Sequence, residues 1–89
     1  MTKRNEFTPE AVAVGAALKS RREASGWSAA DLAEAIGYGP ASIHHWEEGR
    51  RVPALRAIIR MAVVFCVEPT AILEPLNGLL EAEAEKMAG

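Results

Sequence analysis

Two adjacent histidines, His44 and His45, are the side chains of this 89-residue sequence most suited to a chemical role. An imidazole ring can hold a metal, act as a general acid or base, or form hydrogen bonds with another molecule. Both rings belong to the stretch GYGPASIHHWEEG, residues 37–49, and Trp46 follows them directly. Which of these roles applies depends on the secondary structure that contains this stretch and on the reactive groups near it.

Metal binding and catalysis are poorly supported by the surrounding residues. Adjacent residues of a helix point about 100° apart, and no second pair of metal ligands appears at a suitable spacing. No nucleophile or acid is recognisable as a partner for the rings. The single cysteine, Cys66, lies in the apolar run MAVVFCV and is expected to be a small buried side chain. We therefore predict no enzyme activity, no metal and no cofactor.

Composition indicates one small folded domain. The chain is 49% hydrophobic and 25% charged, which excludes an intrinsically disordered chain. A lone cysteine rules out a disulfide within the chain and favours a reducing compartment. The N-terminal residues MTKRNEFTPE lack the apolar core of a signal peptide, and no apolar run approaches the roughly 20 residues of a membrane span. We expect a cytoplasmic protein without membrane contact.

The charge is unevenly distributed along the chain. The net charge of −2 resides in residues 75–89, so residues 1–74 are neutral overall. Local basic groups occur within the neutral part, and local fields matter more for docking than the total charge. These groups are Lys3 with Arg4, Lys19 with Arg21 and Arg22, and Arg50 with Arg51.

Every segment has features of an α-helix, and no run alternates like a half-buried strand. Thr8 is expected to cap the first helix and Ser28 the second, which Gly37 ends in a left-handed conformation. Pro75 and Asn77–Gly78 are expected to break the chain before a last helical segment, LLEAEAEKMA. The five expected helices span residues 9–24, 28–37, 40–48, 54–65 and 69–73.

The second and third helices have the pattern of a helix-turn-helix. Leu32, Ala33 and Ile36 form one apolar stripe on the second helix, and Ala33 leaves room for a close crossing. Ile43 and Trp46 are spaced to point back into the core from the third helix. In the DNA-binding form of this motif, the second of the two helices enters the major groove.

The stretch LKSRREASGWSAADLAEAIGYGPASIHHWEEGRRVPAL resembles the phage-repressor and Cro-like helix-turn-helix family, and the similarity covers about residues 18–73. The resemblance implies an all-α, five-helix lambda-repressor-like domain that binds double-stranded operator DNA as a dimer. It divides the chain into an arm (1–8), the domain (9–74) and a C-terminal extension (75–89) with a candidate sixth helix. The positions that carry it are Arg22, Gly26, Ser28, Leu32, Ala33, Gly37, Ser42, Ile43, Glu47, Gly49 and Pro53.

The outward face of the third helix is the expected base-reading surface. If Ile43 and Trp46 face the core, then Ala41 and His45 lie on the opposite side and His44 flanks them. Imidazole can donate to a guanine edge or a phosphate, and an alanine can meet a thymine methyl group. We expect base contacts from Ala41, His44 and His45. Solvated surface histidines remain the alternative.

The resemblance also implies phosphate contacts and one structural ion pair. Ser42, and the backbone at the start of the second helix around Ser28 and Ala29, are expected to hold phosphates. Arg50 and Arg51 follow the third helix, where phosphates would pass, although they could equally be solubilising charges. The resemblance pairs Glu47 with Arg22 in a partly buried ion pair, and an exposed, phosphate-facing Arg22 is the alternative.

Several polar positions of that family are apolar in this chain. Ala29, Pro40 with Ala41, and Ala54 replace residues that often contact DNA. Fewer phosphate contacts mean weaker and less salt-sensitive binding. The alternative function is therefore a protein-interaction module on the same scaffold, such as an antitoxin or a phage protein that captures a host factor.

The fourth helix, ALRAIIRMAVVF, is apolar on nearly all sides and needs cover on more than one of them. Two covers are open: the C-terminal segment through Leu76, Leu79 and Leu80, or a second subunit in a homodimer through this helix and that segment. Met61 and Val64 are expected to lie away from the core. The core side is expected to hold Leu55, Ile58, Ile59, Ala62 and Phe65.

Overall fold

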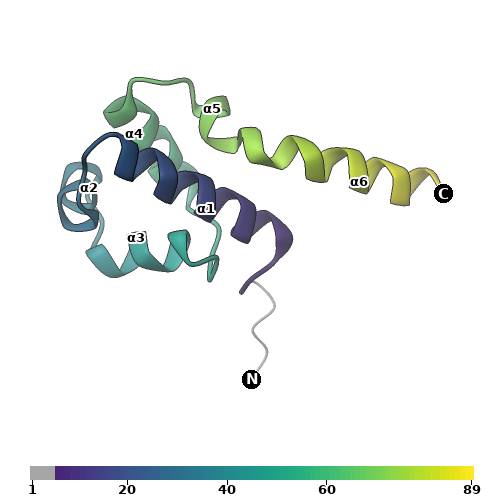
Figure 1. The fold of residues 1–89 in the computed structure, drawn as a ribbon, viewed down its shortest axis with the longest axis horizontal. Helices are drawn as coiled ribbons and strands as arrows, with labels where there is room; N and C mark the ends of the chain where they lie inside the picture. Colours follow the sequence, from purple (N-terminus) through teal and green to yellow (C-terminus); the bar gives the residue numbers. More distant parts are fainter. Residues whose placement is uncertain (1–5) are drawn as a thin grey trace.

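The computed structural model describes residues 6–89, and all regular secondary structure in that range is helical, as the sequence predicts (Figure 1). Lys3 and Arg4, the basic residues of the expected arm, lie outside the described residues. The elements are α1 (Pro9–Ala24), α2 (Ala29–Ile36), α3 (Pro40–Glu47), α4 (Leu55–Phe65), α5 (Pro69–Leu73), the 3-10 turn η1 (Glu74–Leu76) and α6 (Asn77–Ala88).

The predicted helix caps are confirmed. The hydroxyl of Thr8 accepts a hydrogen bond from the Ala11 N–H at 3.2 Å, and the hydroxyl of Ser28 accepts one from the Asp31 N–H at 3.0 Å. Each bond satisfies a backbone donor that has no carbonyl partner within its own helix. Gly37 ends α2 with φ of 80°, in the left-handed region that a side chain disfavours.

The five helices α1 to α5 share a single hydrophobic core. The turn after Gly37 brings α3 against both α2 and α1, so the second and third helices share their buried faces. Burial of these apolar side chains is the main favourable contribution to folding. The largest fully buried side chains are Val14, Leu18, Leu32, Ile36, Ile43 and Met61.

The core-facing side of α4 differs from the sequence-based prediction. Met61, expected away from the core, is fully buried, whereas Leu55 and Ile59, expected inside, are 76% and 57% exposed. A helix that is apolar all round has no polar face to fix its rotation, so periodicity alone could not orient it. The packing of α4 against α2 and α5 orients it instead.

The C-terminal segment also departs from expectation. Asn77 and Gly78 do not break the chain, because they form the first turn of α6, directly after η1. No residue of α6 is buried, and α6 packs mainly on η1 instead of covering α4. In Figure 1, α3 lies on one side of α1 and α6 extends away on the other.

Cys66 is exposed, so the expectation of a buried thiol is wrong. It forms the C-cap of α4 with φ of 58°, a left-handed conformation that the side chain must accept so that the chain can turn towards α5. The sequence did not indicate this turn, because a left-handed cap is usually marked by glycine and Cys66 lies in an apolar run without one.

Candidate nucleic-acid interface

The inward face of α3 is anchored in the core. Ile43 and Trp46 are buried, as the helix-turn-helix pattern predicts. Tyr38, in the turn between α2 and α3, meets the Trp46 ring edge to face, with centroids 5.2 Å apart and planes at 68°. This is a favourable geometry for two aromatic rings. The contact fixes the rotation of α3 about its own axis.

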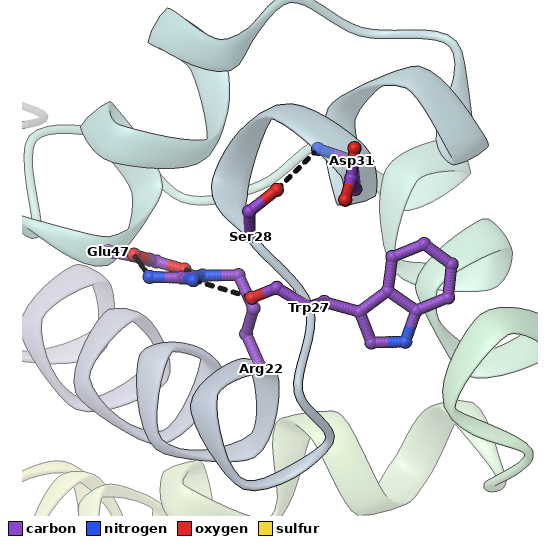
Figure 2. Close-up of polar contacts among 5 residues, drawn as sticks. All are labelled: Arg22, Trp27, Ser28, Asp31 and Glu47. Carbon is purple, nitrogen blue, oxygen red and sulfur yellow. Dashed lines mark hydrogen bonds and ion pairs between the residues drawn. The ribbon is translucent and has the colours of Figure 1, made fainter.

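Arg22 and Glu47 form a buried, bidentate ion pair between α1 and α3 (Figure 2). Arg22 Nε donates to Glu47 Oε2 at 2.6 Å and Nη2 donates to Oε1 at 3.1 Å. Only 11% of the Arg22 side chain and 4% of the Glu47 side chain are exposed. The hydrogen bonds to Glu47 and its negative charge raise the pKa of the Arg22 guanidinium and outweigh the opposing effect of burial.

A third bond extends this pair to α2. Arg22 Nη1 donates to the Trp27 carbonyl at 2.8 Å, immediately before the Ser28 cap of α2 (Figure 2). One guanidinium therefore ties α1 to α3 and to the start of α2. Because a buried charge is costly without partners, this arrangement favours a single geometry of the helix-turn-helix.

Gly15 allows the close crossing of α1 and α3, a role that the sequence analysis missed. A Cβ atom at this position would clash with the Trp46 carbonyl oxygen and would lie 3.0 Å from that of Glu47. The backbone at the end of α3 therefore rests directly on α1. A glycine inside an otherwise helical stretch was the available signal, since such a residue usually has a packing reason.

The opposite face of α3 is open to solvent. Ala41, His44 and His45 are all exposed, and Ser42 is half-buried near the start of the helix. The two imidazole rings thus lie on the side of α3 that faces away from Trp46, where another molecule can reach them. Among residues 6–89, no cluster of histidine, cysteine or acidic side chains could hold a metal ion.

The loop after α3 carries a small charged cluster. Arg50 Nε donates to Glu48 Oε1 at 2.8 Å, and Arg50 Nη1 lies 3.7 Å from Glu6 Oε1. Its guanidinium also stands 5.8 Å from the centroid of the Phe7 ring. The hydrogen bond from Arg50 lowers the pKa of the Glu48 carboxyl. Arg51, the other expected phosphate ligand here, is exposed.

The start of α2 presents mainly backbone groups. Ala29 is buried. The exposed Ser28 hydroxyl accepts a hydrogen bond from the Asp31 N–H, and its own O–H can still donate to another molecule. The N–H groups of Ala29 and Ala30 lie in the first helical turn, where geometry supplies no carbonyl partner. Such groups, at the positive end of the helix dipole, can bind an anion.

A model of the helix-turn-helix domain family matches residues 13–74. The match spans more than half of the sequence, and the chain belongs to this family.

No helix among residues 6–89 is long and apolar enough to cross a membrane.

The chain is similar to several solved structures, among them those of two regulatory proteins. The clp gene regulator ClgR of Corynebacterium glutamicum has 26% sequence identity and a TM-score of 0.72, over 92% of this chain and 89% of ClgR. The restriction-modification controller protein C.AhdI of Aeromonas hydrophila has 28% identity and a TM-score of 0.69, over 73% of this chain and 98% of C.AhdI. No curated protein matches the chain by sequence.

Proposed function

We propose that the protein is a sequence-specific regulator of transcription, of the phage-repressor or Cro-like type, that inserts α3 into the major groove of double-stranded DNA. The carrying observation is the division of α3 into two faces. Ile43 and Trp46 fix one face in the core, while Ala41, His44 and His45 are exposed on the rest of the helix. The two similar structures are of a gene regulator and a controller protein, which supports this proposal.

The base contacts in this proposal come from the exposed residues of α3. His44 and His45 donate to acceptors on guanine or to phosphate, and the Ala41 methyl group meets a thymine methyl group. Phosphates are held by Ser42, by the first-turn N–H groups of α2 after Ser28, and by the arginines that follow α3. Arg50 must exchange Glu48 for a phosphate oxygen, so its contribution is smaller than that of an unpaired arginine.

A dimer completes the proposal. Two recognition helices about one DNA turn apart would match a palindromic operator. The exposed apolar side of α4 supports this assembly, because within the described residues α6 does not cover it.

The test measures fluorescence anisotropy of labelled duplexes at low and moderate salt. Random duplex should bind at low salt and be released as salt rises, because phosphate contacts release counterions. A duplex selected from a random pool should bind more tightly. Absence of any binding at low salt contradicts the proposal and favours a protein-interaction module.

Two substitutions separate the roles of the contacts. His45→Ala should reduce the preference for the selected duplex. Arg50→Ala should weaken all duplexes alike and reduce the salt slope by less than about one, because Arg50 is already paired with Glu48. Glu85→Gln on α6 is the matched control and should change neither quantity. Equal loss of sequence preference from both substitutions would contradict this division.

A further inference from the structure

A groove lies between the start of α1 and the C-terminal helix α6. It has a volume of about 460 Å³, which is within the range of sites that bind another molecule. Its apolar walls include Pro9 on one side and Leu76, Leu79 and Leu80 on the other. This recess, the α1–α6 groove, can therefore receive apolar side chains of a second molecule.

The helix that forms one wall of the groove is poorly covered. No residue of α6 is buried, and Leu80 and Met87 are 67% and 83% exposed. These two residues are seven positions apart, so they lie on the same side of the helix. A helix of only 12 residues is marginally stable by itself in water. A partner that covered this side would therefore both bury apolar surface and stabilise α6.

The charges beside the groove favour a cationic partner. Glu10 lines the groove from α1, and Glu83 lines it from α6. Glu83 pairs with Lys86 at 3.5 Å, whereas Glu10 forms no ion pair within residues 6–89. Residues 75–89 carry three glutamates and one lysine, a net charge of −2. A positively charged partner would thus be attracted to this end of the molecule.

We propose that the α1–α6 groove binds a cationic, amphipathic helix of another protein. The apolar side of that helix enters the groove between Pro9 and Leu80, and its flanking lysines or arginines pair with Glu10 and Glu83. The placing of an amphipathic helix in an apolar groove is a recurrent mode of peptide recognition. This inference goes beyond the proposed function, because it gives a gene regulator a contact with a second protein.

Other occupants fit the groove less well. A second copy of α6 would bring Glu81, Glu83 and Glu85 of two chains together, and like charges at an interface are unfavourable. Nucleic acid carries the same sign of charge as this end of the chain. Moreover, α3 and α6 lie on opposite sides of α1 (Figure 1), so a duplex held by α3 would leave the groove accessible.

The experiment uses a designed helical peptide with leucines at positions i, i+3, i+4 and i+7 and lysines on both flanks. NMR titration of the full chain, without DNA, should shift the amide signals of residues 76–83 and of Glu10, and should leave those of α3 unchanged. Hydrogen exchange of the α6 amides should slow, because the bound helix stabilises α6. Two control peptides, one with the leucines dispersed around the helix and one with glutamates in place of lysines, should bind about tenfold more weakly or worse.

Matched substitutions locate the contact. Leu80→Ser should weaken binding of the peptide by about tenfold or more, whereas Leu55→Ser, on the exposed side of α4, should not. Glu83→Lys should weaken it by about fivefold or more, because it places like charges opposite one another. Glu85→Lys is the control on the same helix, where residue 85 points about 200° away from residue 83, and its effect should be smaller.

Absence of binding, or equally tight binding of either control peptide, overturns the inference. So do equal effects of Glu83→Lys and Glu85→Lys, or signal shifts confined to α4. If Leu80→Ser converts a dimer of the free chain to a monomer in sedimentation equilibrium, the groove belongs to a second copy and the inference is wrong. Because no DNA is present, none of these results depends on the DNA-binding proposal.

Discussion

The contact of α1 with α3 and the contact of α6 with the bundle are built in opposite ways. At the first, the α3 backbone rests on Gly15, and a bidentate ion pair of Arg22 with Glu47 closes the junction. At the second, no residue of α6 is buried, and the helix carries an exposed ion pair of Lys86 with Glu83. Close packing and a buried ion pair therefore hold α3, the helix whose outward face carries the histidines, in a fixed position on α1.

The difference indicates where substitutions should be tolerated. Close packing leaves no room for added atoms, and a buried charge cannot lose its partner without penalty. An exposed helix of 12 residues has neither constraint, and alone it would be only marginally stable. Changes at the junction of α1 and α3 should therefore alter the whole domain, while changes in α6 should remain local.

The largest expected effect comes from removing one partner of the buried ion pair. Glu47→Ala leaves the Arg22 guanidinium buried without its carboxylate, and the free energy of unfolding should fall by about 3 kcal/mol or more. Chemical denaturation measures this change. Glu48→Ala, at the neighbouring exposed glutamate, is the matched control and should have little effect. Similar losses from both would show that the junction carries no special stability.

The second-largest effect is expected at the close crossing of α1 and α3. Gly15→Ala should destabilise the fold by about 2–3 kcal/mol, because the added methyl group forces α3 away from α1. Gly78→Ala is the control within α6, where an added Cβ meets no atom within 4 Å. Alanine there should leave the melting temperature unchanged or slightly raised, since it favours a helix over glycine. A stable Gly15→Ala variant would mean that the crossing is loose.

Removal of α6 should have a smaller effect. A chain ending at residue 76 should lose less than about 1 kcal/mol, because α6 buries little apolar surface. Thermal unfolding followed by circular dichroism measures the change, after correction for the lost helical signal. The result also tests the proposed boundary of the domain near residue 74. Unfolding of the shortened chain would show that α6 supports the bundle after all.

The smallest effect concerns the titration of Glu48. Its folded pKa is lowered, mainly by the hydrogen bond from Arg50, so its contribution to stability is present above the ordinary carboxyl pKa. That contribution is lost as pH falls through the lower, folded value. NMR titration of the side-chain carboxyl should show the lowered pKa in the wild-type chain. Arg50→Gln should return it towards the ordinary value, and an unchanged titration would exclude the contact in solution.

Local signals in the sequence predicted the fold well. Thr8, Ser28 and Gly37 act through neighbouring residues, so their capping roles follow from the sequence alone. Ile43 and Trp46 are three residues apart, so they lie on the same face of a helix. Together these signals were enough to orient α3 and to expect its exposed histidines.

Most features that the sequence did not predict depend on distant contacts. The ion pair of Arg22 with Glu47 is the exception among such contacts, because the family resemblance implied it and the structure contains it. The importance of Gly15 depends on the backbone of α3, about 30 residues away along the chain. Choosing Met61 over Ile59 for the core depends on how α4 packs, because both side chains are apolar. The exposed Cys66 depends on a left-handed turn without glycine. The DNA contacts themselves remain predictions, as does the dimer.

The anchoring of Phe7 has a practical consequence. Its backbone N–H donates to the Gly49 carbonyl at 2.6 Å, so the chain enters the bundle beside the loop that follows α3. A bulky fluorophore attached at or next to Phe7 would therefore lie close to the loop after the histidine-bearing helix and should hinder the access of that helix to a ligand. Labels for binding assays belong at the carboxyl end, which α6 carries away from that helix (Figure 1).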